Sequence, residues 1–262
     1  MEKLPKSVVF ITGTFFANSC WDEWKLYLES EGYTCLALAW PHKNSSAEEL
    51  RNGHHDAAIA STRLATLTKF YADIIKALHV KPILIGHSVG GLIVQLLLQQ
   101  GLGAAGVAIH SFPPSGILRF GIWSLKNWWQ TVGVFSSVNK PYRIAFEKWK
   151  NDIANGMPGD QQIQSYYDYS IPESKLVVRD AFSKMTMLNS QAHRAPLLLT
   201  SGGRDQFIPS SVNYKNYAEQ LKQFNSTTDY KEFKDSNHLV FGQRECMDEA
   251  EFIVCWFKRT SN

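Results

Sequence analysis

The sequence lacks the features that mark binding to nucleic acid or insertion into a membrane. Its 27 Lys and Arg residues nearly balance its 24 Asp and Glu residues, so the net charge is only +3, and no basic cluster is present. We therefore expect no nucleic-acid partner. The apolar run that follows Lys3 and Lys6 covers only residues 8–11, which is too short for a signal peptide or a membrane span. These absences favour a cytoplasmic protein without stable membrane insertion.

The sequence is also poor in motifs that hold metals or cofactors. It has only four cysteines, at positions 20, 35, 246 and 255, and none forms a CxxC pair or a Cys/His ligand spacing. We interpret them as small apolar residues in a reducing compartment, since no spacing supports a disulfide. Walker and dinucleotide-binding glycine patterns are missing, so no cofactor is expected. His54, His55 and Asp56 lack a further ligand at a suitable spacing, which is more typical of a solvated loop than of a metal site.

What the sequence does contain indicates a globular α/β protein. Its 262 residues, 44% hydrophobic and 19% charged, are sufficient to bury a full core. Short, largely apolar runs predict strands at residues 7–12, 33–40, 83–85, 106–110 and 196–202, and a last strand is expected at residues 230–235. Amphipathic or apolar patterns predict helices at residues 19–32, 59–78, 92–98, 212–224 and 245–258. This alternation favours a mostly parallel sheet with helices on both faces.

Two regions interrupt the alternation. Residues 41–58 are polar and are expected to form an irregular loop. Residues 112–194 are too many for a plain loop and predict four helices, at 122–132, 141–151, 161–169 and 172–188. The last would begin at a capping box, Ser170-Ile171-Pro172-Glu173. We expect residues 1–111 and 195–262 to form the core domain and residues 112–194 a helical cap, whose aromatic side chains pack on the sheet rim or in a small core of the cap.

The most informative stretch is Gly86-His87-Ser88-Val89-Gly90, which separates a β-branched apolar run from an apolar helical pattern. It matches the G-x-S-x-G nucleophile elbow in the strand–turn–helix context that this motif requires. Such a tight turn strains the backbone of the serine and leaves room only for glycine at the flanking positions. It would place Ser88 Oγ at a helix N-terminus, where the helix dipole favours a developing negative charge.

Later loops supply the base and the acid that a serine nucleophile needs. Asp205 follows the strand at 196–202 and His238 follows the last strand, so both should reach the sheet edge that carries Ser88. The chain order Ser, Asp, His is the order of one known fold. Residues 111–113, which follow the preceding strand, contain no carboxylate, and this favours Asp205 as the acid. None of the other candidate bases follows the last strand: His42, His54, His55, His79, His110 and His193.

An oxyanion formed during attack by Ser88 would need two backbone N–H donors. The N–H of Val89, at the start of the helix, is the first. The second is expected from the loop after the first strand, Thr12-Gly13-Thr14-Phe15.

These motifs resemble the capped, esterase and lipase-like branch of the α/β-hydrolase fold superfamily, and the resemblance extends over essentially the whole chain. It implies an eight-stranded, mostly parallel sheet and no cofactor. The sequence departs from the family in having Thr12-Gly13 where His-Gly is frequent and Asn237-His238 where Gly-His is usual. By position, Thr14 would supply the second oxyanion donor.

We therefore expect a serine carboxylic-ester hydrolase that acts through Ser88, His238 and Asp205 on a small apolar or aromatic ester-like substrate. The expected pocket comprises Phe15, His87, Trp123, Trp128, Phe207 and Leu239. The serine argues against haloalkane dehalogenase and epoxide hydrolase chemistry, since those relatives use an aspartate at this position. Thioester, lactone or C–C bond hydrolysis and hydroxynitrile lysis remain alternatives, because one triad serves all of them. A ligand-binding protein with a silent or slow triad is an alternative of another class, and the oligomeric state is open.

Overall fold

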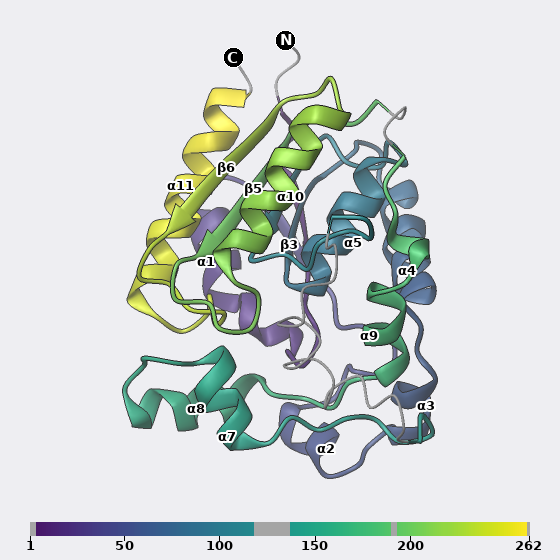
Figure 1. Ribbon diagram of the computed structural model, residues 1–262, viewed down its shortest axis with the longest axis vertical. Helices are drawn as coiled ribbons and strands as arrows, with labels where there is room; N and C mark the ends of the chain where they lie inside the picture. Colours follow the sequence, from purple (N-terminus) through teal and green to yellow (C-terminus); the bar gives the residue numbers. More distant parts are fainter. Residues whose placement is uncertain (1–3, 118–136, 190–192, 261–262) are drawn as a thin grey trace.

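The computed structural model describes residues 4–117, 137–189 and 193–260, and its centre is a parallel sheet (Figure 1). The sheet has the order β2-β1-β3-β4-β5-β6, and every neighbouring pair is parallel. Its strands are β1 (Ser7–Ile11), β2 (Thr34–Ala37), β3 (Ile83–His87), β4 (Ala105–Ile109), β5 (Leu197–Gly202) and β6 (Thr228–Phe233). The expected fold class is confirmed, although the described residues form six strands where the family resemblance implies eight.

Helices cover both faces of this sheet (Figure 1). On one face α1 (Asp22–Ser30) contacts α11 (Arg244–Thr260). On the other face lie α4 (Leu64–Ala77), α5 (Val89–Leu98) and α10 (Ser210–Gln223), with α5 packed on β3 and β4 and α10 packed on β5 and β6. The strands β3 and β4 are buried along their whole length. Strands covered on both sides become continuous apolar runs, which is why the sequence indicated them.

Residues 41–58, expected to be irregular, include two short helices instead. These are α2 (Ala47–Arg51) and α3 (Asp56–Ser61). Earlier in the chain, a 3-10 turn, η1 (Asn18–Trp21), lies directly before α1. A capping box starts α2, because the Ser46 hydroxyl accepts a hydrogen bond from the Glu49 N–H while the Glu49 side chain accepts one from the Ser46 N–H. Leu50 and Ile59 are buried in a small second cluster. Tertiary burial therefore stabilises helices that are too short to form alone.

The described part of the region expected to be a cap, residues 137–189, is less helical than predicted. It contains α7 (Phe146–Lys148), a π-helical turn η2 (Trp149–Ile153), α8 (Gly159–Tyr169), α9 (Lys175–Ala181) and a 3-10 turn η3 (Lys184–Thr186). The α8 prediction is confirmed, whereas the predicted helix at 172–188 is wrong in extent. Ser174, not Ser170, caps α9 by accepting a hydrogen bond from the Leu176 N–H. The predicted helix at 122–132 lies outside the described residues.

The carboxyl ends of the strands face α7 and α8, and both chain termini lie at the opposite end of the molecule (Figure 1). In the described part of the chain, no helix is both long enough and apolar enough to cross a bilayer. Cys20, Cys35 and Cys255 are free thiols, in agreement with the interpretation of the cysteines as unpaired. Of the residues expected to be catalytic, Ser88 follows β3, Asp205 follows β5 and His238 follows β6, so all three belong to loops at the carboxyl edge of the sheet.

Candidate active site

The turn between β3 and α5 has the strained geometry that the sequence predicted. Ser88 connects the two elements with φ 56° and ψ −121°, a backbone conformation that residues other than glycine rarely adopt. Two hydrogen bonds tie its backbone to β4 and the loop after it, from the Ser88 N–H to the Ile109 carbonyl (3.0 Å) and from the Phe112 N–H to the Ser88 carbonyl (3.0 Å). A Cβ on Gly90 would lie 2.1 Å from the Ile11 carbonyl oxygen. The close approach of α5 to β1 therefore requires glycine here.

Asp205 and His238 meet at the same edge. The Nδ1 of His238 lies 2.7 Å from the Oδ2 of Asp205, and both side chains are buried. The other carboxylate oxygen, Oδ1, accepts hydrogen bonds from the backbone N–H groups of Phe207 (2.8 Å) and Ile208 (2.7 Å). Because a carboxylate only accepts, Nδ1 of His238 carries the proton and Nε2 is left with a free lone pair. The imidazole is thus oriented and held in the tautomer that can accept a proton.

Two atoms at the centre of the site have no partner. Ser88 Oγ and His238 Nε2 are both buried, and neither makes a hydrogen bond within the described part of the chain. A buried polar atom without a partner is costly, and such atoms concentrate where a ligand supplies the missing contact. Here they are the hydroxyl that would attack and the nitrogen that would take its proton. Ser88 has 0% of its surface exposed, so the site is closed in this structure.

The loop after β1 passes close to the elbow. A Cβ on Gly13 would lie 2.8 Å from the Cβ of Ser88, so the loop passes directly over the serine. The Phe15 N–H is directed to Glu173 Oε2 (3.4 Å), whereas no hydrogen bond between described residues uses the N–H of Thr14. The N–H of Val89, at the start of α5, is likewise unused. Both predicted oxyanion donors are therefore free to bind a ligand.

Thr12 replaces the histidine that the family often has, and the structure gives it a local role. Its hydroxyl accepts a hydrogen bond from the indole N–H of Trp21 (3.2 Å), which anchors the start of the loop to η1. Trp21 is fully buried and stacks on Phe10 of β1, with ring centroids 4.7 Å apart. The departure from the family pattern is thus accommodated by packing against β1.

A buried ion pair holds the other end of this loop. The Lys43 ammonium lies 2.6 Å from Glu173 Oε2, and the two side chains are 3% and 0% exposed. The same carboxylate accepts hydrogen bonds from the N–H groups of Phe15 and Ser174. Phe15 has a positive φ of 72°. Glu173 therefore fixes a strained residue of the loop, in a role that the sequence did not indicate.

Aromatic rings surround His238. The Phe207 ring lies 4.8 Å from the His238 ring, the His87 ring 4.7 Å from it, and Phe15 contacts Phe207 at 6.4 Å. Four of the six predicted pocket residues are thus buried at or beside the site: Phe15, His87, Phe207 and Leu239. The other two, Trp123 and Trp128, lie outside the described residues. The role of all six in binding stays a prediction.

Sequence reasoning missed Phe16. Its ring lies 5.0 Å from the His87 ring and 6.5 Å from the His238 ring. Trp149, from the predicted cap, packs on Phe16 at 5.1 Å. The position of Phe16, directly after the predicted oxyanion loop, was the available signal.

Two further buried histidines flank the site. His87 donates from Nε2 to the His238 carbonyl (2.9 Å), and burial, aided by the two neighbouring histidines, holds its pKa well below the ordinary value. His110, excluded as the base because it does not follow the last strand, nevertheless lies beside Asp205, with Nδ1 3.5 Å from Oδ2. Its Nε2 lies 3.6 Å from Oε2 of Glu249 in α11. No sequence pattern pointed to Glu249, because only tertiary packing brings α11 to the site.

One group of side chains in the described residues has donor atoms close enough together to suggest a metal site. These are His110, Asp205 and His238, whose donor atoms lie within 4.8 Å of one another. The 2.7 Å separation of His238 Nδ1 and Asp205 Oδ2 is that of a hydrogen bond. Two ligands of a tetrahedral zinc ion, each about 2.0–2.2 Å from the metal, lie more than about 3 Å apart. The geometry therefore fits a hydrogen-bonded chain better than a metal centre.

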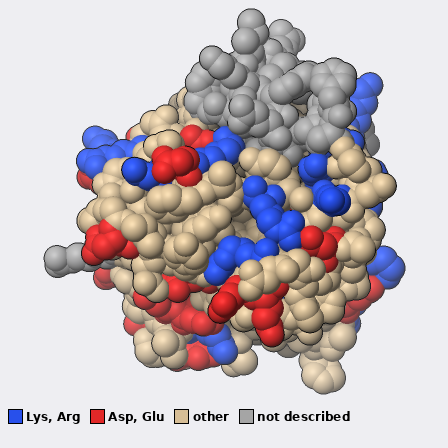
Figure 2. Space-filling model, turned by 90° about the horizontal axis from the view of Figure 1, so that it is seen from below, with Lys and Arg blue, Asp and Glu red and all other residues tan. Residues whose placement is uncertain are grey.

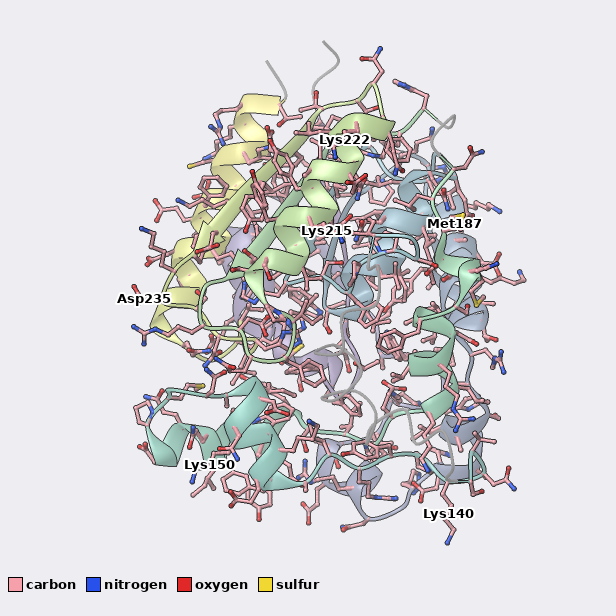
Figure 3. The ribbon with its side chains drawn as sticks, viewed as in Figure 1. Lys140, Lys150, Met187, Lys215, Lys222 and Asp235 are labelled. Atoms are coloured by element: carbon pink, nitrogen blue, oxygen red, sulfur yellow. The ribbon has the colours of Figure 1, made fainter. Side chains whose placement is uncertain are left out.

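Two surface clefts lie away from Ser88. One, of about 480 Å³, runs between α4 and α5. The other, of about 430 Å³, is lined by polar residues that include Arg204, Asp235 and Asn237, the last adjacent to His238 in sequence. Asp235 lies at the side of the molecule, above α8 (Figure 3). Seen from the α7–α8 end, basic and acidic side chains are interspersed over the described surface (Figure 2).

A family model described as the alpha/beta hydrolase family matches residues 8–249. No curated protein matches the sequence. Solved structures similar to the whole chain are available. Polyneuridine aldehyde esterase is 14% identical with a TM-score of 0.67, covering 97% of this chain and 100% of its own.

Two other solved structures match to a similar degree. An extracellular alpha/beta-hydrolase from a Paenibacillus species, described as sharing structural and functional homology with tobacco salicylic acid binding protein 2, is 21% identical. Its TM-score is 0.66, and the match covers 96% of this chain and 98% of that one. Tomato methylketone synthase I, solved with 2-tridecanone, is 13% identical with a TM-score of 0.68, covering 99% of each chain. At these identities the likeness concerns the fold.

Proposed function

The chain belongs to the alpha/beta hydrolase family, and on this premise we propose that it is a serine hydrolase of carboxylic esters. One observation carries the proposal. At the carboxyl edge of the sheet, Asp205 fixes the His238 imidazole through a 2.7 Å hydrogen bond, beside a strained serine whose Oγ is buried without a partner. A nucleophile, an oriented base and an acid are what acyl transfer requires.

In the proposed mechanism, His238 Nε2 takes the proton from Ser88 Oγ as the oxygen attacks the ester carbonyl. Asp205 stays ionised and stabilises the imidazolium that forms. The N–H groups of Val89 and Thr14 bind the oxyanion of the tetrahedral intermediate, with α5 adding the field of its N-terminus. His238 then returns the proton to the leaving alcohol. Water attacks the acyl-enzyme in the same way, and releases the acid and the free serine.

We also propose an apolar or aromatic acyl or alcohol group for the substrate. The aromatic rings around His238 support this class, because they would exclude water and favour an apolar ligand. Residues 112–194 would act as the cap. The Leu239 N–H donates to the Ile153 carbonyl (3.0 Å), and Trp149 packs on Phe16, so this segment already contacts the site. Because Ser88 is fully buried, substrate entry requires the groups above it to move apart.

Other chemistries on the same fold remain as alternatives. The similarity to a methylketone synthase as well as to esterases illustrates that the fold does not fix the reaction. Thioester, lactone and C–C bond hydrolysis and hydroxynitrile lysis all use such a triad. A slow or silent triad in a ligand-binding protein is the alternative of another class. The cytoplasmic location also stays a prediction.

The proposal is tested by hydrolysis of a graded series of acyl esters and thioesters. We expect Ser88→Ala to lower kcat by about 10³- to 10⁶-fold and His238→Ala by a comparable factor, because triad members act as a unit. Ser165→Ala is the matched control: Ser165 is a buried serine in α8 whose hydroxyl is hydrogen-bonded to Trp149 and Gln162. A Ser88→Ala enzyme that keeps more than a few per cent of the wild-type rate would contradict the assignment of the nucleophile.

Labelling with an active-site phosphonate separates the alternatives. Turnover that depends on Ser88, with an optimum in chain length, supports an esterase and sizes its acyl site. Labelling of Ser88 without ester turnover directs the search to lactones, C–C bonds and lyase substrates. Neither turnover nor labelling favours the ligand-binding protein.

A further inference from the structure

Beside Asp205 lies a second histidine–carboxylate pair. His110 follows β4 with a positive φ of 42°, and its ring is fully buried between Asp205 and Glu249. Nδ1 lies 3.5 Å from Asp205 Oδ2, and Nε2 lies 3.6 Å from Glu249 Oε2. The four side chains therefore form one buried row: His238, Asp205, His110 and Glu249. The proposed mechanism uses only the first two.

Burying the polar atoms of His110 and Glu249 costs free energy unless the two side chains form an ion pair. Both carboxylate oxygens of Glu249 and both ring nitrogens of His110 lack a hydrogen bond of normal geometry within the described residues. Their compensation comes from the ion pair between them, with the backbone of Asn237 also favouring the charged form of His110. The titratable groups that face His110 are Asp205, Glu249 of α11, and the rings of His87 and His238, each 6.4 Å away. Burial by itself lowers the pKa of His110, but Glu249 and Asp205 outweigh burial and raise it above the ordinary value.

We propose that His110 and Glu249 form a positioning pair for the acid of the triad. In this pair His110 is positively charged and holds Asp205 ionised and aligned. The Glu249 carboxylate stabilises the protonated form of His110. The inference rests on the proposed serine hydrolase activity. With His110 charged, the row holds two carboxylates and one cation, and it reaches neutrality when His238 takes the proton from Ser88. With His110 neutral, two buried carboxylates lack a cation, and one ring nitrogen of His110 presents a lone pair to a carboxylate. Asp205 then stabilises the imidazolium of His238 less well.

The first test is the pH dependence of kcat and KM for wild type, Glu249→Gln and His110→Asn. Loss of the His110 proton should end activity on the alkaline side. Glu249→Gln should therefore move the basic limb of the kcat profile down by at least about one pH unit, because Glu249 contributes more than Asp205 to the raised pKa of His110. His110→Asn should remove that limb and lower kcat by about 10- to 100-fold with KM nearly unchanged. A role in folding alone would not move the limb.

The second test does not depend on turnover. Nitrogen-15 NMR of histidine-labelled wild-type protein should find His110 as an imidazolium at pH 7 and above, and Glu249→Gln should shift its titration to lower pH. This measurement uses the intact protein, so the proposal stays testable even if His110→Asn does not fold. Glu251→Gln, an exposed position of the same helix, and the exposed His79→Asn are matched controls that should change neither readout.

A neutral His110 at pH 7 in the wild type would overturn the proposal, and so would a basic limb that coincides in wild type and Glu249→Gln. Failure of the serine hydrolase assignment has another signature. In that case Ser88→Ala remains active or the wild type turns over no substrate, whatever the protonation state of His110.

Discussion

Removing one partner of the buried pair Lys43–Glu173 should destabilise the protein more than removing both. Lys43→Met leaves the Glu173 carboxylate buried, and among the described residues its remaining hydrogen-bond donors are the N–H groups of Phe15 and Ser174. Glu173→Gln leaves the Lys43 ammonium against the ring of Trp40, 4.4 Å away, with burial already lowering the pKa of this amine. In each case a charge stays in a place that water does not reach.

The magnitude follows from the burial of the pair. The two side chains are 3% and 0% exposed, so solvent does not screen the remaining charge, and an uncompensated buried charge costs about 3–5 kcal/mol. Total stabilities are about 5–15 kcal/mol, so each single variant should lose a large fraction. For a chain of this size the melting temperature should fall by about 6–20 °C. The double variant Lys43→Met/Glu173→Gln holds no charge, and it should lie within about 1 kcal/mol of the wild type.

Urea unfolding of the wild type, the two single variants and the double variant forms a thermodynamic cycle that measures the coupling energy between Lys43 and Glu173. The coupling energy should be at least about 3 kcal/mol, because the two side chains are in direct contact. The exposed pair Lys69–Asp73 on α4, with 75% and 56% exposure, is the matched control and should give less than about 1 kcal/mol. Single variants of the buried pair that each cost less than about 1 kcal/mol would refute the reasoning, since they would mean that water reaches the pair.

Two further predictions concern the elbow. Burial holds the pKa of His87 well below its ordinary value, so only the unfolded chain binds its proton, and the free energy of unfolding should fall by about 2 kcal/mol from pH 6.5 to pH 5. Urea unfolding at several pH values across this window should show that His87→Gln lacks this pH dependence of the free energy of unfolding. The pKa of His110 is raised, so the protonation of His110 changes the free energy of unfolding only above about pH 6.5. Gly90→Ala should cost about 3 kcal/mol or more, because its Cβ would meet the Ile11 carbonyl, whereas Gly159→Ala, in open space, should change stability by less than about 0.5 kcal/mol.

The sheet could be predicted from the sequence, whereas the connections on its carboxyl side could not. All six strands lie within a few residues of their predicted positions. For the four inner strands this is because burial on both faces produces continuous apolar runs, whereas the edge strands β2 and β6 are partly exposed. The helices α2 and α3 are short and polar, and they depend on the burial of Leu50 and Ile59. The capping box Ser46–Glu49 was a signal for α2 that the interpretation as a loop overlooked.

The pattern Ser170 to Glu173 shows why a local motif can mislead. Its spacing is that of a capping box, but Glu173 forms its ion pair with Lys43, 130 residues earlier in the chain. Ser170 instead donates its N–H to the Tyr166 carbonyl at the end of α8. A motif read over four residues contains no information about a partner brought in by the fold. The same limit hid Glu249, whose place beside His110 depends on how α11 packs.

The topology explains why the candidate triad residues could be selected from the sequence. In a parallel sheet the loops that follow the strands all emerge at one edge, so residue type and order are enough to assign Ser88, Asp205 and His238 to that edge, where Asp205 and His238 are in contact. The electrostatics around them obey another rule. Replacing a buried ion pair by apolar residues is often neutral or stabilising, so stability alone does not account for Glu173 and Glu249. Each instead contacts a residue next to the proposed catalytic groups. Glu173 binds the N–H of Phe15 in the oxyanion loop, and Glu249 contacts His110 beside Asp205, so each buried carboxylate helps to position those groups.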